Sequence, residues 1–429
     1  MKEKNRNKET VRVFLVSIIR NEEKALPRLL DSVASVVDGV VLCDTGSTDG
    51  TIGVIESWSQ QHAEIPVHVF SDTWKNFGHN RTLSIEHAKS VIPTMEQPHT
   101  FMLFLDADMV LEHEWATRSR VRLWKEEELI RSPVWYLYQN GHGIRYHNLR
   151  IVRADVNVVC VQPTHEYYDI RVTTPIPPDL FPDEPRVVHC GRGYLDERIW
   201  IRDVGDGGCK QDKFTRDIRL LTAHLETHPK DARTLFYLAN SYKNIHDLPN
   251  ACRFYRERIA VGGWVQEVYM SWIYLGDCHL LAGKQDMQAL DAFWHATTVL
   301  PERPEAWYRC IKMARLRGAH AMAIALLDYA QKLPRTWPGE CIPLFLENSI
   351  FDYLWDEETS ICAFYVRDMA RGRESCARLL DPSRSVPAHV RALAQQNARF
   401  YGPVREKTCL PTSNPLATPP SPCSSSVSC

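Results

Sequence analysis

Two aspartates separated by one residue are the side chains of this sequence that are best suited to carry chemistry. Asp106 and Asp108 follow an apolar run that begins at Phe101. If that run is a strand, positions two apart lie on the same side, so both carboxylates can reach one cation. Carboxylate oxygens suit Mg²⁺ or Mn²⁺, which keep coordination positions for water and substrate phosphates. The pair predicts a metal site for a phosphate-bearing substrate, although short acidic patterns also occur in solvated turns.

The elements that would position this pair alternate between strand-like and helix-like segments over the first two hundred residues. This alternation is typical of an α/β fold with a parallel sheet, in which ligands bind beyond the carboxyl ends of the strands. Polar residues follow each of four predicted strands at that end. The strands and the residues that follow them are Val11–Ile19 with Asn21 and Glu22, Gly39–Cys43 with Asp44, Val67–Phe70 with Asp72, and Phe101–Leu105 with Asp106 and Asp108.

Two further regions follow the predicted sheet. Residues 134–200 are rich in β-branched and aromatic residues and include a proline-rich loop. Beyond Asp217 the sequence becomes helical, and its small and aromatic residues recur with the spacing of a tetratricopeptide unit. Two such units and a weaker third of roughly 34 residues each satisfy the minimum for a stable stack. The segment from 404 to 429, rich in Pro, Ser and Thr, lacks the apolar content to fold.

Length, charge and cysteine usage narrow the class of protein. A chain of 429 residues exceeds the size of a single core, so we expect two or three domains. The 51 Lys and Arg balance 53 Asp and Glu, which argues against a nucleic-acid or anionic-membrane partner. Thirteen cysteines are scattered without CxxC or zinc-ligand spacing, so we expect reduced core thiols and a cytoplasmic protein. The apolar run at Val11–Ile19 is too short to span a bilayer.

Four ordered motifs resemble those of family 2 glycosyltransferases with the GT-A fold, in the branch of lipopolysaccharide-core glucosyltransferases. They are VSIIRNEE at 16–23, DTGSTDGT at 44–51, DTWKNFGHNR at 72–81 and LDAD at 105–108. Two later motifs, PTHE at 163–166 and VHCG at 188–191, are similar to downstream elements of that branch. A fusion to tetratricopeptide-like repeats also fits it. The resemblance covers about residues 11–335.

The resemblance implies roles for the polar residues at the strand ends. Asp106 and Asp108 would hold Mn²⁺ or Mg²⁺, with His189 either a third ligand or a structural residue. A metal there would neutralise the diphosphate that leaves a nucleotide-sugar donor, for which a UDP-sugar is the favoured candidate. The side chains that would bind this donor are Asn21, Glu22, Asp44, Asp72, Arg81 and Asp106, with Gly46 allowing close backbone approach.

An inverting transfer also needs a general base to deprotonate the acceptor. Glu166 is the candidate, with His165 either orienting it or binding substrate; a polar pair on a strand edge is the alternative. Asp155 and Asp169 are weaker rivals for the same role. The acceptor, a glycan, lipid-linked glycan, protein or peptide, would be held by the helical repeats.

The resulting prediction is a GT-A α/β catalytic domain followed by an all-α tetratricopeptide-like domain. The predicted boundaries are 1–10 for a flexible N-terminus, 11–205 for the catalytic domain, 206–230 for a connecting helix, 231–335 for the repeats, 336–403 for capping helices and 404–429 for a disordered tail. The function would be that of a hexosyltransferase. One alternative is a repeat scaffold with a non-catalytic nucleotide-sugar-binding domain, and another is nucleotidyl transfer, against which the acidic RNEE motif argues.

Overall fold

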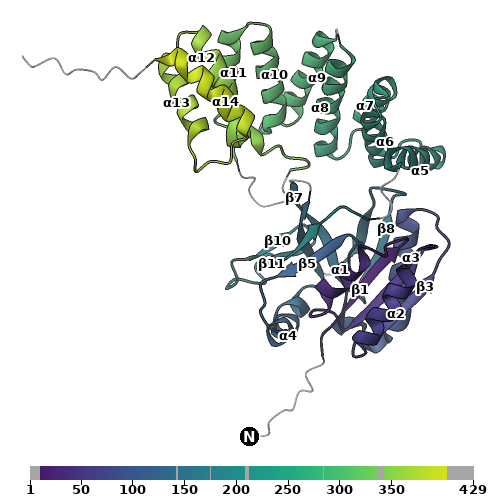
Figure 1. Ribbon diagram of the computed structural model, residues 1–429. Coiled ribbons are helices and arrows are strands. Elements are labelled where there is room, and N and C mark those ends of the chain that lie inside the picture. The colour runs from purple at the N-terminus through teal and green to yellow at the C-terminus, as the bar shows by residue number, and fades with distance from the viewer. Residues whose placement is uncertain are drawn as a thin grey trace, which may run out of the picture. The chain divides into compact units, whose positions relative to one another are not determined.

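The computed structural model describes residues 10–141, 144–173, 175–207, 212–283, 285–335 and 343–402. They form a GT-A-like mixed sheet with flanking helices, followed by a succession of helices (Figure 1). The chain divides into two compact units, residues 1–351 and residues 352–429. Among the residues described, no helix combines the length and the apolar character needed to cross a membrane.

Four parallel strands form one half of the sheet, in the order β4-β1-β2-β3. The apolar runs of β1, β2 and β4 are nearly continuous because both faces of the sheet are covered there, whereas β3, at the edge, is only partly buried. The polar groups that the sequence predicts at strand ends follow these four strands. The strands are β1 (Arg12–Ile19), β2 (Gly39–Asp44), β3 (Val67–Ser71) and β4 (Thr100–Phe104), and the helices that follow β1, β2 and β3 are α1 (Leu26–Val33), α2 (Thr51–Gln61) and α3 (Phe77–Val91).

The other half of the sheet is mixed, and its order continues from β4 through β7, β6 and β11 to β10, with β5 also paired to β11. The sequence does not predict β5, most of β11 or the helix α4. The strands are β5 (Met109–His113), β6 (Val134–Gly141), β7 (Ile144–Arg153), β10 (Val187–Cys190) and β11 (Gly193–Asp203), α4 is Arg118–Glu127, and β8 (Asn157–Val161) pairs with β9 (Tyr167–Arg171) in a separate small sheet.

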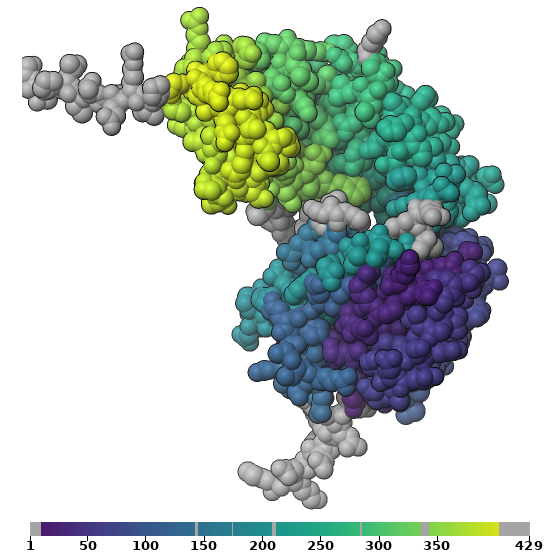
Figure 2. Space-filling view, in the orientation of Figure 1, coloured from purple at the N-terminus to yellow at the C-terminus, as the bar shows by residue number. Residues whose placement is uncertain are grey.

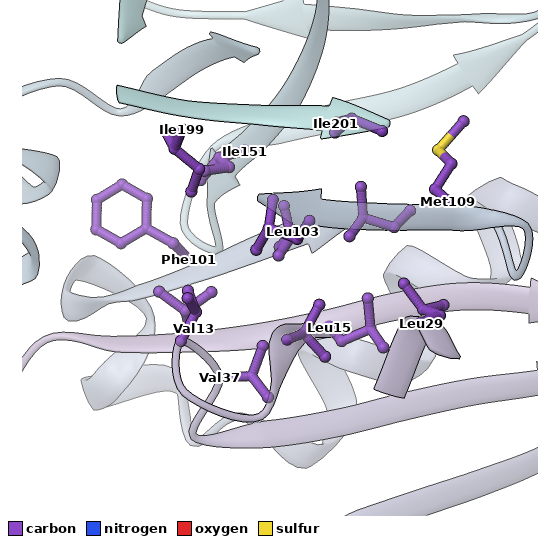
Figure 3. Packing of buried hydrophobic residues seen from close by; sticks show 14 of the residues in the cluster. Val13, Leu15, Leu29, Val37, Phe101, Leu103, Met109, Ile151, Ile199 and Ile201 are labelled. Atoms are coloured by element: carbon purple, nitrogen blue, oxygen red, sulfur yellow. The ribbon is translucent and has the colours of Figure 1, made fainter. Parts of the chain in front are cut away.

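A buried apolar cluster joins the two halves of the sheet (Figure 3). Val13 on β1 and Leu103 on β4 share it with Leu29 on α1, Met109 on β5 and Ile201 on β11. Only residues 105–108 connect β4 to β5, and yet β5 pairs with a strand on the far side of the sheet order. The sheet therefore curls, and the acidic pair lies in the short connection between β4 and β5.

Three helical hairpins occupy the region predicted to repeat, and helices adjacent in sequence pack together (Figure 1). At Gly276 an added Cβ would lie 2.4 Å from the Phe293 ring, so the small residue permits close packing of its hairpin. The hairpins are α6 (Ala232–Asn244) with α7 (Leu248–Val261), α8 (Val265–Ala282) with α9 (Asp286–Val299), and α10 (Pro304–Leu316) with α11 (His320–Ala330); α5 (Lys213–Thr227) precedes them.

The second compact unit is helical and contains α12 (Trp355–Tyr365), α13 (Met369–Leu380) and α14 (Ala388–Ala398). Leu379, Val390 and Ala394 form part of its core. In the space-filling view the described atoms of α13 and α14 pack closely, as do the purple and blue segments of the α/β region (Figure 2). The predicted tail at 404–429 and residues 1–9 lie outside the described residues.

Candidate active site

Arg81 links the two acidic groups to which the sequence assigns chemistry. Its Nη2 donates to Asp106 Oδ1 at 2.5 Å, and its Nε donates to Glu166 Oε1 at 2.7 Å. Only 9% of the Arg81 side chain is exposed, whereas Asp106 is 30% exposed and Glu166 is 17% exposed. The predicted metal ligand and the predicted base therefore contact neighbouring nitrogens of one guanidinium group, although 60 residues of sequence separate them.

The environment keeps Arg81 charged. Burial by itself lowers the pKa of this guanidinium, but the negative charges of Asp106 and Glu166 outweigh that effect and hold its pKa well above the ordinary value. Removal of Arg81 would leave two neighbouring carboxylates without their common counter-charge. The three side chains therefore behave as one charged cluster.

The first turn of α3 fixes Arg81 against the loop that carries Glu166. Asn76 caps the helix by accepting from the backbone N–H of His79 at 2.8 Å. The backbone N–H of Phe77 donates to Pro163 O at 3.1 Å. At Gly78 an added Cβ would lie 2.3 Å from Gln162 O, so only glycine fits this approach. Helix and loop are thus in direct backbone contact just before Glu166.

The acidic pair lies in a turn and does not continue the strand as predicted. β4 ends at Phe104, and the N–H of Met109 donates to Asp106 O at 3.0 Å, which closes a turn around Asp106 and Asp108. Strand alternation is therefore the wrong reason to place the two carboxylates together. The turn is what holds both of them at the end of β4.

Asp108 faces a different set of groups from Asp106. Its Oδ2 accepts from the backbone N–H of Gly207 at 3.3 Å, and its charge contributes to raising the pKa of Arg28 on α1. The larger cause of that raised pKa is the two-pronged hydrogen bond from Arg28 to Asp206. Sequence reasoning missed Arg28 and Asp206, because neither belongs to a recognisable motif.

Arg150 is a second residue that the sequence analysis missed. It lies on β7, is 7% exposed, and donates to Phe104 O at 3.3 Å and to Gln139 Oε1 at 2.8 Å. It therefore places a positive charge beside the end of β4. The available signal was a charged residue inside the apolar run Leu149–Val152.

The structure does not bring His189 to the acidic pair. His189 lies on β10 opposite Tyr194, near the start of β11, whereas the neighbour of Asp108, Met109, lies opposite Asp203 at the end of that strand. On the neighbouring strand β6, residue 135 pairs with the start of β11 and residue 140 pairs with its end. Five residues of a strand span about 17 Å, so the two ends of β11 lie about that far apart. This separation favours the alternative that His189 is a structural residue.

His165 contacts the helical region. Its ring stacks on Tyr237 of α6 at a centroid distance of 4.0 Å, and its Nε2 lies 3.5 Å from Asp217 Oδ2 on α5. Its backbone has a φ of +53°, which is uncommon for a residue with a side chain. His165 thus holds the 162–166 loop against α5 and α6, which is a positioning role compatible with the orienting alternative.

The residues after β1 and β2 are tied to each other across the sheet edge. The N–H of Asn21 donates to Ser47 Oγ at 2.9 Å, and Asn21 Oδ1 accepts from the N–H of Thr48 at 2.7 Å. Asp44 accepts from the Ser47 hydroxyl at 2.6 Å. Gly46 has a φ of +103° with open space where a Cβ would lie, so a backbone surface is available there.

Glu22 and Asp72 differ in their surroundings. Glu22 is 9% exposed, and its N–H donates to Thr51 Oγ1 at 2.8 Å, so it lies beneath the loop that follows β2. Asp72 Oδ1 lies 3.1 Å from His87 Nε2 on α3. One oxygen of the Asp72 carboxylate therefore contacts α3.

Comparisons with known proteins were made for the α/β region and the helical region. Residues 15–182 match the family model described as glycosyl transferase family 2. No curated protein matches the chain. The helical part is similar to the crystal structure of YrrB, a TPR protein with an unusual peptide-binding site; the identity is 17%, the match covers 43% of this chain and 82% of that chain, and the TM-score is 0.34. It is also similar to the crystal structure of TTC0263, a thermophilic TPR protein in Thermus thermophilus; the identity is 15%, the match covers 43% of this chain and 90% of that chain, and the TM-score is 0.31.

The matched range contains β1 to β4, the acidic turn, Arg81 and Glu166. Fold, motif order and model match therefore lead to one conclusion. Residues 15–182 form a glycosyltransferase domain of family 2.

Proposed function

We propose that the protein is a metal-dependent, inverting hexosyltransferase that moves a sugar from a nucleotide-sugar donor to a hydroxyl acceptor. The observation that supports this most is the charged cluster in which Arg81 bridges Asp106 and Glu166. A transferase needs a group that stabilises the leaving diphosphate and a base that activates the acceptor, and both must lie within reach of one substrate. The family match supports the reaction class.

The donor set of the acidic turn fits a hard divalent cation. Asp106 and Asp108 offer carboxylate oxygens, which suit Mg²⁺ or Mn²⁺ better than softer metals. When bound, such an ion would neutralise charge on the leaving diphosphate. Asp106 and Asp108 would hold the ion together; Asp106 shares one oxygen with Arg81, and Asp108 shares one with the backbone N–H of Gly207. Arg28 and Arg81 add positive charge on either side of the turn.

Nucleotide recognition is assigned to the edge formed after β1 and β2. Asn21, Glu22 and Asp44 lie there, and the open backbone at Gly46 permits close approach of a ligand. A UDP-sugar is the donor that we expect. Asp72 is left out of this set, because its carboxylate faces His87.

Glu166 is proposed as the base that takes the acceptor proton. A carboxylate can take up a proton from an acceptor hydroxyl, and the contact with Arg81 fixes the position of this one. The acceptor oxygen attacks the anomeric carbon while the bond to the diphosphate breaks, and the proton passes to Glu166. His165 and the loop before it hold Glu166 in place through contacts with α5 and α6.

The acceptor is proposed to be a glycan, protein or peptide that is held by the helical hairpins. A groove of about 290 Å³ lies in that region and is lined by polar and apolar side chains, among them Asp277, Arg309 and Leu316. Arg309 pairs with Asp277 and Glu347, so these charges largely cancel. The groove therefore does not select strongly for a charged ligand. Such a surface suits a polar chain with apolar groups.

The test is release of nucleoside diphosphate from a panel of nucleotide sugars in the presence of Mn²⁺. We expect turnover with one donor, loss of turnover with a chelator, and a decrease of at least roughly 100-fold in Asp108→Ala and Glu166→Gln. The configuration of the product, read by nuclear magnetic resonance, checks inversion.

Asp155→Asn is the matched control. Asp155 is a rival carboxylate that pairs with Arg153 on the surface, so its variant should retain full turnover. Unchanged activity in Asp108→Ala, or equal losses in Glu166→Gln and Asp155→Asn, would contradict the proposal.

A further inference from the structure

Three side chains outside the acidic turn converge on the α3 face of the sheet. Cys43 is near the end of β2, Asp72 follows β3, and His87 lies on α3. The sulfur, one carboxylate oxygen and one ring nitrogen all lie within 4.8 Å of one another. Among the described residues, this is the one group of three or more Cys, His, Asp or Glu side chains with such proximity.

The geometry comes from the sheet register. Cys43 pairs with Phe70, so Asp72, two positions beyond Phe70, lies on the same face as Cys43. The Phe70 ring stacks on His87 at a centroid distance of 4.1 Å, which fixes the imidazole over that face. One ligand atom from each of three separate segments therefore lies at the same point, and the packing of the sheet against α3 holds all three atoms there.

The ligand chemistry differs from that of the acidic turn. A thiolate, an imidazole and a carboxylate are the donors that Zn²⁺ prefers, and bond lengths of about 2.0–2.3 Å place tetrahedral ligands about 3.3–3.7 Å apart. The contact of 3.1 Å between His87 Nε2 and Asp72 Oδ1 lies close to that range. One zinc ion with one thiolate, one carboxylate and a neutral imidazole carries no net charge, so burial of the complete set leaves no uncompensated charge.

Asp72 provides a second, independent indication of a ligand. Its Oδ2 is buried and has no hydrogen-bond partner among the described residues. A buried carboxylate oxygen without a partner is costly, and a bound cation removes that cost. His87 is 27% exposed and Asp72 is 13% exposed, so an ion can reach the group from solvent while Cys43 closes it on the inner side.

We infer that Cys43, Asp72 and His87 form a zinc site with three protein ligands that is separate from the Mg²⁺ or Mn²⁺ site of the acidic turn. The ion joins β2, the segment after β3 and α3. Because α3 also carries Arg81, the zinc ion stabilises the helix that holds the charged cluster.

The first test uses the unaltered full-length chain. After removal of metal with a chelator, the protein is loaded with Co²⁺ or Zn²⁺ and passed through a desalting column. We expect about one zinc ion retained per chain, and a sulfur-to-cobalt charge-transfer band in the near-ultraviolet spectrum of the Co²⁺ form. The oxygen ligands of the acidic turn cannot produce that band, so its absence would overturn the inference.

The second test compares two buried cysteines of the same domain. Cys43→Ser should lose the charge-transfer band and most of the retained zinc, while Cys190→Ser, on β10, should keep both. Equal zinc retention in the two variants would refute the assignment. Because the cobalt spectrum comes from the unaltered chain, the inference remains testable if Cys43→Ser fails to fold, and none of these readouts requires transferase activity.

Discussion

At the scale of single residues, the sharing of Arg81 between two carboxylates is the feature with the largest consequence. One planar guanidinium reaches Asp106 with Nη2 and Glu166 with Nε. A lysine ammonium is a point charge and cannot reproduce both contacts in that geometry. We predict that Arg81→Lys retains the fold but lowers turnover by at least roughly 10-fold in the nucleotide-release assay, because Glu166 and Asp106 lose their common anchor.

The control for that prediction is Arg122→Lys. Arg122 is 77% exposed and pairs with Glu126 one helical turn away, a contact of small energetic weight. Its variant should match the parent in turnover and in thermal stability. If Arg81→Lys also matched the parent, the bridge would have no part in positioning the two carboxylates.

At the scale of elements, the contact between α3 and the 162–166 loop makes a prediction about two glycines. Gly78→Ala would press a Cβ against Gln162 O, so helix and loop must separate; we expect a loss of about 1–3 kcal/mol in the free energy of unfolding. Gly53→Ala, on α2, meets no atom within 4 Å and should raise stability by about 0.4–1 kcal/mol. Urea unfolding of both variants measures the difference.

The turnover of Gly78→Ala and Gly53→Ala in the nucleotide-release assay is a second measurement on the same two variants. Displacement of the loop moves Glu166 relative to Arg81, so Gly78→Ala should lose activity at temperatures where it is still folded, and Gly53→Ala should not. Equal stability of the two variants would show that the loop yields without cost.

The elements that sequence predicts well are those with a local pattern. β1, β2 and β4 are largely apolar runs, and their ends lie within one residue of the predicted ends. The hairpins lie within the range 231–335 that was predicted to repeat. β5 and β11 were missed, because β5 begins one residue after Asp108 and pairs with a strand far along the chain, and β11 includes charged residues and a register shift after Leu195. Pairing between distant segments leaves no local signal.

The same distinction applies to the site. Motif order predicted Arg81, Asp106 and Glu166, and the structure brings them together. Motif order could not show that His189 lies at the other end of β11, or that Asp72 turns toward α3, because both depend on tertiary geometry. Arg28 and Arg150 carry no motif at all.

At the scale of the whole molecule, the two compact units should unfold separately. In the second unit Asp356 receives ion pairs from Arg378 at 2.7 Å and Arg384 at 2.8 Å, and only 10% of its side chain is exposed. We predict that Asp356→Ala lowers the stability of this unit by about 1–3 kcal/mol, because two arginines lose a largely buried partner. Scanning calorimetry should show one transition moving and the other staying in place.

Glu374→Gln is the control for this prediction. Glu374 is 72% exposed and lies 3.9 Å from the same Arg378, so its loss should leave both transitions unchanged. A single transition that shifts as a whole in Asp356→Ala would mean that the units unfold cooperatively.

The position of the acidic turn has a mechanical consequence. Residues 105–108 connect a strand in the middle of the sheet to β5, which pairs with β11, the strand next to the end strand β10. Any ligand that draws Asp106 and Asp108 together also fixes the angle at which β5 leaves β4. Donor occupancy would therefore tighten the curl of the sheet, and backbone amides of β11 would exchange their hydrogens more slowly although none of them belongs to the proposed donor-binding residues.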